Sequence, residues 1–221
     1  MIKIGDMFFP DGERHFQAFG DAIADYQRPQ REYAFGYVTS WEVALDLGAN
    51  VGIFSRHFAE RFTKVIAVEP LIDNVECLRL NVPGNVEIIQ TAVGDRAGTV
   101  RIYKTPKGLG GAFVSDHEDV ERPNISMRSE LLEEVPMVTV DSLKLQNVGL
   151  VKLDLQGSEL IALRGAAETL RRCRPVAMIE EKPLGGQGGS MQHVFDARAL
   201  LLELGYTMAD MVGADRIYRF V

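Results

Sequence analysis

The sequence predicts an α/β fold in which a mainly parallel sheet of seven strands carries helices on both faces and ends in an antiparallel strand. Three observations lead to this prediction. From Val43 onwards, short apolar runs typical of buried strands alternate with apolar residues at helical spacing. A strand, a tight glycine turn and a helix follow one another directly at residues 43–62. Two short strands near 206–208 and 216–220, joined by Gly-Ala-Asp, suggest a closing hairpin.

Composition and charge indicate one compact domain over residues 1–221. The chain has 46% apolar and 25% charged residues, and it is long enough for a full core but short for two domains. A net charge of −7 argues against a nucleic-acid partner, because binding phosphates needs clustered basic residues. No apolar run approaches a membrane span, and no signal peptide is recognisable. We expect a cytoplasmic protein with no membrane partner, and the oligomeric state stays open.

The first 40 residues predict a small unit outside the main sheet. Residues 2–4 and 7–9 are apolar runs near a Pro-Asp-Gly turn signal, which suggests a hairpin. Residues 16–38 have loosely helical spacing, interrupted at Arg28-Pro29. The part with Tyr26, Gln27 and Tyr33 either folds over a ligand as a lid or belongs to a helix that covers the edge of the sheet.

The strand at 43–47 and its turn contain the first candidate site residues. The turn carries Gly48 and Gly52, and we expect the backbone there to pass so close to a ligand that a side chain would block it. About 20 residues later a second strand ends in Glu69, where a carboxylate can accept hydrogen bonds from two ribose hydroxyls. A dinucleotide fingerprint would need glycines at Asn50 and Ile53, so the phosphate cradle is absent.

The rest of the chain continues the alternation. Apolar runs predict strands at 86–90, 99–103, 137–140, 150–153 and 176–179. Helices are predicted from apolar faces at Leu71/Val75/Leu78, at Leu160/Leu163/Ala167/Leu170 and at Phe195/Ala199/Leu202. Residues 104–135 lack a regular pattern and are expected to form an insert loop, while residues 185–190 form a glycine-rich run. Cys77 and Cys173 fit small core residues better than a disulfide or a metal pair.

Four sequence pieces together resemble one family. These are Leu-Asp-Leu-Gly-Ala-Asn-Val-Gly at 45–52, Val-Glu-Pro at 68–70, Val-Thr-Val-Asp at 138–141 and Lys-Leu-Asp-Leu-Gln-Gly-Ser-Glu at 152–159. The first resembles motif I of the class I methyltransferases, and the set resembles the FkbM family of S-adenosylmethionine-dependent methyltransferases. The resemblance implies a Rossmann-like class I methyltransferase fold and, most often, transfer of a methyl group to oxygen. It departs from the family at Gln156, where the family has glutamate.

The resemblance also implies a cofactor site. Asp46, Gly48, Asn50 and Gly52 would surround the methionine end of S-adenosylmethionine, and Glu69 would hold its ribose. Two further residues at the end of the third strand, Thr91 and Ala92, would border the adenine.

Methylation of a hydroxyl needs a general base within hydrogen-bond reach of the acceptor. Asp154 and Glu180 follow neighbouring strands, at the edge where open α/β sheets bind ligands, and we predict that both are catalytic. Each could instead cap its own turn. His193 and His117 lie in irregular segments and are further possible bases, whereas His57 fits a structural role.

We expect no metal ion, because the carboxylates Asp154, Glu159 and Glu180 lack a dedicated ligand spacing. The expected acceptor is a small molecule or sugar, enclosed by residues 104–135 and 185–190. Two alternatives stay open: a nicotinamide-dependent oxidoreductase, and a binding protein that has lost activity through Gln156.

Overall fold

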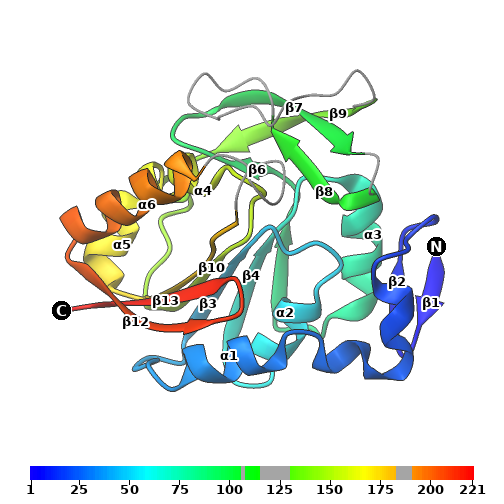
Figure 1. The fold of residues 1–221 in the computed structure, drawn as a ribbon, viewed down its shortest axis with the longest axis horizontal. Coiled ribbons are helices and arrows are strands. Elements are labelled where there is room, and N and C mark those ends of the chain that lie inside the picture. Colours follow the sequence, from blue (N-terminus) through cyan, green and yellow to red (C-terminus); the bar gives the residue numbers. More distant parts are fainter. Residues whose placement is uncertain (106–107, 115–129, 183–190) are drawn as a thin grey trace.

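The computed structural model describes residues 1–105, 108–114, 130–182 and 191–221, and a seven-stranded sheet lies at its centre (Figure 1). The strand order is β12-β13-β11-β10-β3-β4-β5. The strands are β3 (Val43–Leu47), β4 (Lys64–Val68), β5 (Val86–Ile89), β10 (Val148–Leu153), β11 (Val176–Glu180), β12 (Tyr206–Val212) and β13 (Asp215–Phe220). Neighbours from β11 to β5 pair in parallel, whereas β13 is antiparallel to both β11 and β12. The predicted sheet and its antiparallel last strand are confirmed.

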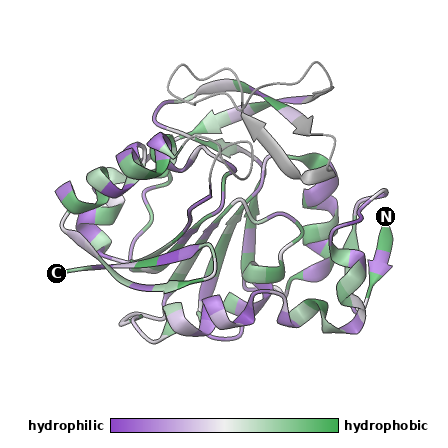
Figure 2. Cartoon of the chain, viewed as in Figure 1, coloured by the Kyte–Doolittle hydropathy of each residue, from purple (hydrophilic) through white to green (hydrophobic). Residues whose placement is uncertain are grey.

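Helices cover both faces of this sheet because its central strands are apolar on both sides. One face packs against α4 (Glu159–Arg164), α5 (Ala167–Cys173) and α6 (Gln192–Glu203) through residues such as Leu45 and Val151. The other packs against α1 (Arg28–Phe35), α2 (Ile53–Phe58) and α3 (Ile72–Asn81). Figure 2 shows the apolar residues concentrated in the central strands. A fully buried strand such as β10 is typical of a parallel sheet between two helical layers.

The N-terminal unit forms as predicted, with a hairpin of β1 (Ile2–Ile4) and β2 (Met7–Phe9) outside the main sheet. A 3₁₀ helix, η1 (Phe16–Asp25), leads from it to α1. The fully buried Arg31 of α1 donates to the carbonyl oxygens of Ala24 and Ile53 at 2.9 and 3.2 Å. This side chain therefore ties the N-terminal unit to the start of α2.

The insert is not the continuous loop that was expected. A second sheet has the order β6-β9-β7-β8, with β6 (Ala92–Val93), β7 (Gly98–Thr105), β8 (Gly108–Val114) and β9 (Glu130–Val138). Within residues 104–135, β8 lies near the start and β9 begins near the end. Each of these two strands pairs antiparallel with β7. Residues 115–129, with His117, and the 185–190 run lie outside the described residues. The second sheet lies beyond one end of the main strands (Figure 1).

Two helix predictions were wrong in detail. The helix expected over residues 160–170 is broken at Gly165 into α4 and α5, where the Gly165 carbonyl accepts from the Asp141 N–H at 2.9 Å. Helix α6 forms and ends at Glu203, two residues before Gly205, yet Phe195, Ala199 and Leu202 are exposed. The face that packs on the sheet side carries Val194, Ala197 and Leu201 instead.

Two smaller features complete the fold. Both cysteine thiols are free, and Cys77 is buried in the core as expected, whereas Cys173 is half-buried. In the described parts of the chain, every helix is too short or too polar to cross a membrane.

Candidate functional site

The turn after β3 has the tight backbone that its glycines predicted. In this structure, the atoms that lie close to the two glycines belong to other parts of the protein. Gly48, Asn50 and Gly52 all have positive φ, of 79°, 52° and 93°. A Cβ at Gly48 would lie 2.1 Å from the backbone oxygen of Asp154, and one at Gly52 would lie 2.4 Å from the side chain of Leu78. The glycines therefore allow the turn after β3 to approach the backbone after β10 and the side chains of α3, while the expected close approach to a ligand stays a prediction.

Glu69, after β4, is buried and bonded to the same turn. Its Oε2 accepts from the backbone N–H of Asn50 at 2.9 Å, while Oε1 accepts from the Leu71 N–H at 3.2 Å and the Asn74 side chain at 3.0 Å. Burial raises the pKa of this carboxyl, and these three donors oppose that shift. A carboxylate has about four acceptor sites, so Oε2 keeps capacity for a further hydrogen bond.

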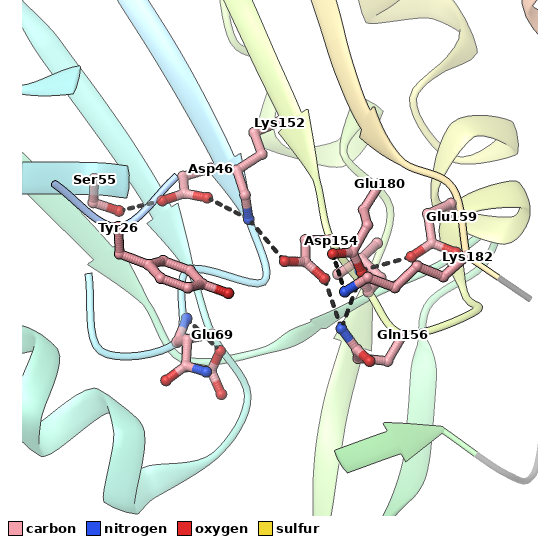
Figure 3. Close-up of polar contacts among 12 residues, drawn as sticks. Tyr26, Asp46, Ser55, Glu69, Lys152, Asp154, Gln156, Glu159, Glu180 and Lys182 are labelled. Atoms are coloured by element: carbon pink, nitrogen blue, oxygen red, sulfur yellow. Dashed lines mark hydrogen bonds and ion pairs between the residues drawn. The ribbon is translucent and has the colours of Figure 1, made fainter. Parts of the chain in front are cut away.

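A buried lysine links two of the predicted site residues. Lys152 is the only charged side chain of β10, and its Nζ lies 3.5 Å from Asp46 Oδ1 and 3.6 Å from Asp154 Oδ2. Asp46 also accepts from the Ser55 hydroxyl at 2.6 Å (Figure 3). Burial acts to lower the pKa of Lys152, but the two carboxylates outweigh it and raise that pKa, so the ammonium stays charged. The lysine thereby holds the ends of β3 and β10 together.

On the other side of Asp154, an amide joins two carboxyl groups. Gln156 Nε2 donates to Asp154 Oδ1 at 2.7 Å and to Glu180 Oε2 at 3.4 Å, and Lys182 forms an ion pair with Glu180 (Figure 3). We call Asp46, Lys152, Asp154, Gln156, Glu180 and Lys182 the edge cluster. Its members come from the carboxyl ends of β3, β10 and β11, where the topology of a parallel sheet brings ligand-binding residues together.

The two predicted catalytic carboxyls titrate differently. Burial acts to raise the pKa of Asp154, but the ammonium groups of Lys152 and Lys182 outweigh it and hold that pKa below its usual range. Burial, together with the charge of Asp154, raises the pKa of Glu180 to about 8. Near neutral pH the pair therefore combines a charged Asp154 with a Glu180 that readily holds a proton.

Glu159 orders the loop that carries Gln156. Its carboxylate accepts from the backbone N–H groups of Leu155 at 2.8 Å and Gly157 at 3.0 Å. Gln156 itself has a φ of 53°, which side chains rarely adopt, so the loop needs this support. Burial raises the pKa of Glu159 to about 7. The residue has a structural role in this arrangement.

Tyr26 reaches the edge cluster from the N-terminal unit. Figure 3 shows its ring between Asp46 and Glu69, with the hydroxyl toward Asp154. Burial raises the pKa of this phenol, with smaller effects from Lys182 and Asp154. Helix α1, by contrast, packs against β11 and β12, and its Tyr33 is exposed. Helix α1 therefore fits the alternative of a covering helix, whereas a lid that includes Tyr26 stays a prediction.

The remaining candidates are less central. Thr91 is buried and its hydroxyl donates to the Pro136 carbonyl at 2.8 Å, while Ala92 begins β6. His193 lies buried in the first turn of α6 and not in an irregular segment. His57 is buried with Nε2 3.3 Å from Glu32, which fits its expected structural role. Among the described residues, no three His, Cys, Asp or Glu side chains are arranged to hold a metal ion.

Sequence reasoning missed Lys152 as a site residue, although it lies within a quoted motif. The signal was present: a single charge inside a strand that is otherwise apolar, bordered by Asp154, requires a partner once the strand is buried.

Comparisons with known proteins bear on this site. A family model described as the methyltransferase FkbM domain matches residues 46–208. No curated protein matches the chain. The solved structure of methyltransferase FkbM from Methylobacillus flagellatus KT is 15% identical with a TM-score of 0.54, and the match covers 94% of this chain. It covers 56% of that chain, so this chain spans little more than half its length.

Two further solved structures share the fold over nearly their whole length. Precorrin 8w decarboxylase from Methanobacterium thermoautotrophicum is 14% identical with a TM-score of 0.51, and the match covers 100% of both chains. Precorrin-6y C5,15-methyltransferase from Geobacter metallireducens GS-15 is 10% identical with a TM-score of 0.52, and the match covers 97% of this chain and 95% of that one.

Proposed function

The chain belongs to the FkbM methyltransferase family, and from this premise we propose that it transfers the methyl group of S-adenosylmethionine to a hydroxyl group of a small molecule or sugar. The family match confirms the resemblance read from the four motifs, and the fold is that of the Rossmann-like class I methyltransferases. The edge cluster is the observation that supports the proposed chemistry most strongly.

The residues around the glycine turn fit the proposed cofactor. Glu69 keeps acceptor capacity on Oε2 for a ribose hydroxyl, next to the Asn50 N–H that already binds it. Next to the turn, the carboxylates of Asp46 and Asp154 flank the single ammonium group of Lys152, and this local balance favours a cationic sulfonium.

The other contacts follow from position in the fold. Asp46, Gly48 and Gly52 would surround the methionine end, while Thr91 and Ala92 would border the adenine through apolar and backbone contacts. When bound, S-adenosylmethionine supplies an electrophilic methyl group, so this chain has to position the acceptor and manage one proton.

The acceptor side of the proposed site is formed by Asp154 and Glu180. Asp154 is 26% exposed and charged, so it can accept a hydrogen bond from an acceptor hydroxyl and take its proton. Glu180, with its raised pKa, can donate or accept at the same place. Gln156 fixes the distance between the two carboxyls, and we propose that it supports activity where the family has glutamate.

A methyl-transfer screen tests this proposal. Purified protein would be incubated with isotope-labelled S-adenosylmethionine and pooled sugars and small hydroxylated metabolites. We expect labelled products from the wild type and a loss of at least 100-fold in Asp154→Asn, with S-adenosylhomocysteine affinity retained. A wild type that binds S-adenosylhomocysteine but labels nothing, while Gln156→Glu is active, would instead support an inactive binding protein.

A further inference from the structure

A third carboxyl group, on the antiparallel strand β13, lies beside Glu180. Asp215 is the residue opposite Glu180 in the β11–β13 pairing. Residues directly opposite each other in an antiparallel pair project from the same face, with Cβ atoms about 4.5–5.5 Å apart. The Asp215 side chain therefore lies on the face where Glu180 meets Gln156 and Asp154, and the charges of Lys152, Asp154 and Lys182 act on it.

Asp215 differs from Asp154 and Glu180 because one of its carboxyl oxygens, Oδ2, is buried without a hydrogen-bond partner in the described part of the chain. Its side chain is 3% exposed, and Oδ2 has no hydrogen-bond donor among the described residues. Asp154 accepts from Gln156, and Glu180 is paired with Lys182. A buried carboxylate oxygen is normally hydrogen-bonded, and one that is not calls for a specific reason. Beside a proposed acceptor site, the missing donor is most simply a group of the ligand.

We propose that Asp215 binds the methyl acceptor, through a hydrogen bond from a second donor group adjacent to the one that is methylated. The inference rests on the proposed function and narrows its substrate class to acceptors with neighbouring donors, such as the vicinal hydroxyls of a sugar or cyclitol. Glu180 and Asp215, side by side on one face, each accept from one of the two groups. The side chain of Lys182, 53% exposed, can swing aside to admit the ligand without disturbing the sheet.

The state of Asp215 suits this role. Burial raises its pKa to about 6, a shift that Lys152 opposes. Above neutral pH it is therefore an anionic acceptor with a free lone pair, whereas Glu180 still shares a proton. A single-hydroxyl ligand would leave Oδ2 without a donor, and this is how a polar site discriminates against an analogue that lacks one group.

The test uses the full chain loaded with S-adenosylhomocysteine, and saturation-transfer NMR titrations of three probes. These are myo-inositol and methyl α-D-glucopyranoside, which have vicinal hydroxyls, and cyclohexanol, which has one. We expect the wild type to bind a polyol at least tenfold more tightly than cyclohexanol. Asp215→Asn should lose that preference while its S-adenosylhomocysteine affinity stays within twofold. Asp210→Asn, on the neighbouring strand β12, is the matched control and should behave as wild type.

Three outcomes would overturn the inference: unchanged polyol preference in Asp215→Asn, equal binding of cyclohexanol and polyols by the wild type, or binding of neither polyol. Each of them leaves the proposed function standing if S-adenosylhomocysteine still binds. If the wild type does not bind S-adenosylhomocysteine, both the proposed function and the inference about Asp215 are contradicted. Thermal melts of every variant would show that the comparison is made between folded proteins.

Discussion

At the scale of single residues, Lys152 holds the edge cluster together. It is 4% exposed by side chain and neutralises Asp46, whose side chain is fully buried. We expect Lys152→Met to lower the free energy of unfolding by about 3–5 kcal/mol, because it leaves a buried carboxylate unpaired. Urea unfolding measures this loss.

The matched control for that variant is Lys64→Met. Lys64 pairs with Glu87 at 2.6 Å, but both side chains are about half exposed. Solvent screens such a pair, so we expect a loss of about 1 kcal/mol or less. Equal losses in the two variants would contradict the role assigned to Lys152.

Gln156 gives a second prediction at this scale. Gln156→Glu replaces the bridging amide with a third carboxylate beside Asp154 and Glu180, whose mutual repulsion already raises the pKa of Glu180. We expect the melting temperature of this variant to fall relative to wild type, more at pH 8 than at pH 5, and to recover with millimolar Mg²⁺ or Mn²⁺. The wild type should show no such recovery. Stabilisation of both proteins by the cation would contradict this account of the amide.

At the scale of elements, Gly165, at the break between α4 and α5, makes one close approach to another segment. A Cβ at Gly165 would lie 1.9 Å from the backbone oxygen of Gly94, which belongs to the segment after β6. Gly165→Ala should therefore cost about 1–3 kcal/mol of unfolding free energy, since backbone must move. Gly84→Ala, where nothing lies within 4 Å, should change stability by less than about 1 kcal/mol in denaturant titrations. Equal costs for the two substitutions would contradict this steric constraint on residue 165.

The elements also show what the sequence can and cannot predict. Strands β3, β4, β10 and β11 follow from local apolar runs, and their carboxyl ends correctly located Asp46, Asp154 and Glu180. The need for glycine at position 165 depends on a residue about 70 positions away, which no local period contains. In α6 the apolar residues nearly surround the helix, so spacing alone selected the exposed face with Phe195 and Leu202.

The same limit applies to the site. Asp215 and Tyr26 join it through the strand order and the N-terminal unit, neither of which is a local property. The strand at 99–103 was predicted, but its pairing with β9 joins segments that are far apart in the sequence, so the second sheet was not.

At the scale of the whole molecule, buried acids should make stability depend on pH. Burial raises the pKa of Asp215 to about 6, of Glu159 to about 7 and of Glu180 to about 8. Each therefore contributes stability that is complete below its unfolded pKa, near 4, and is lost as pH rises through the folded value. His57 opposes this, because burial lowers its pKa, so that its contribution grows as pH rises toward about 6.5 and is complete above that value.

We expect the three acids to outweigh His57, so that the melting temperature of the ligand-free protein falls between pH 5 and pH 8. Glu159→Gln should flatten that fall, because it removes one of the titrating groups. Scanning calorimetry at matched ionic strength measures both. A melting temperature that rises over this range would mean that the acids are not buried as described.

The central claim, an S-adenosylmethionine site built on the turn after β3 and on Glu69, is tested most directly by calorimetry with S-adenosylhomocysteine. The wild type should bind it, and Glu69→Ala should bind at least tenfold more weakly, because the ribose loses its carboxylate and the Asn50 N–H loses its partner. Glu76→Ala, an exposed glutamate on α3, is the control and should bind as wild type. Equal affinity of wild type and Glu69→Ala, or no binding by either, would contradict the account.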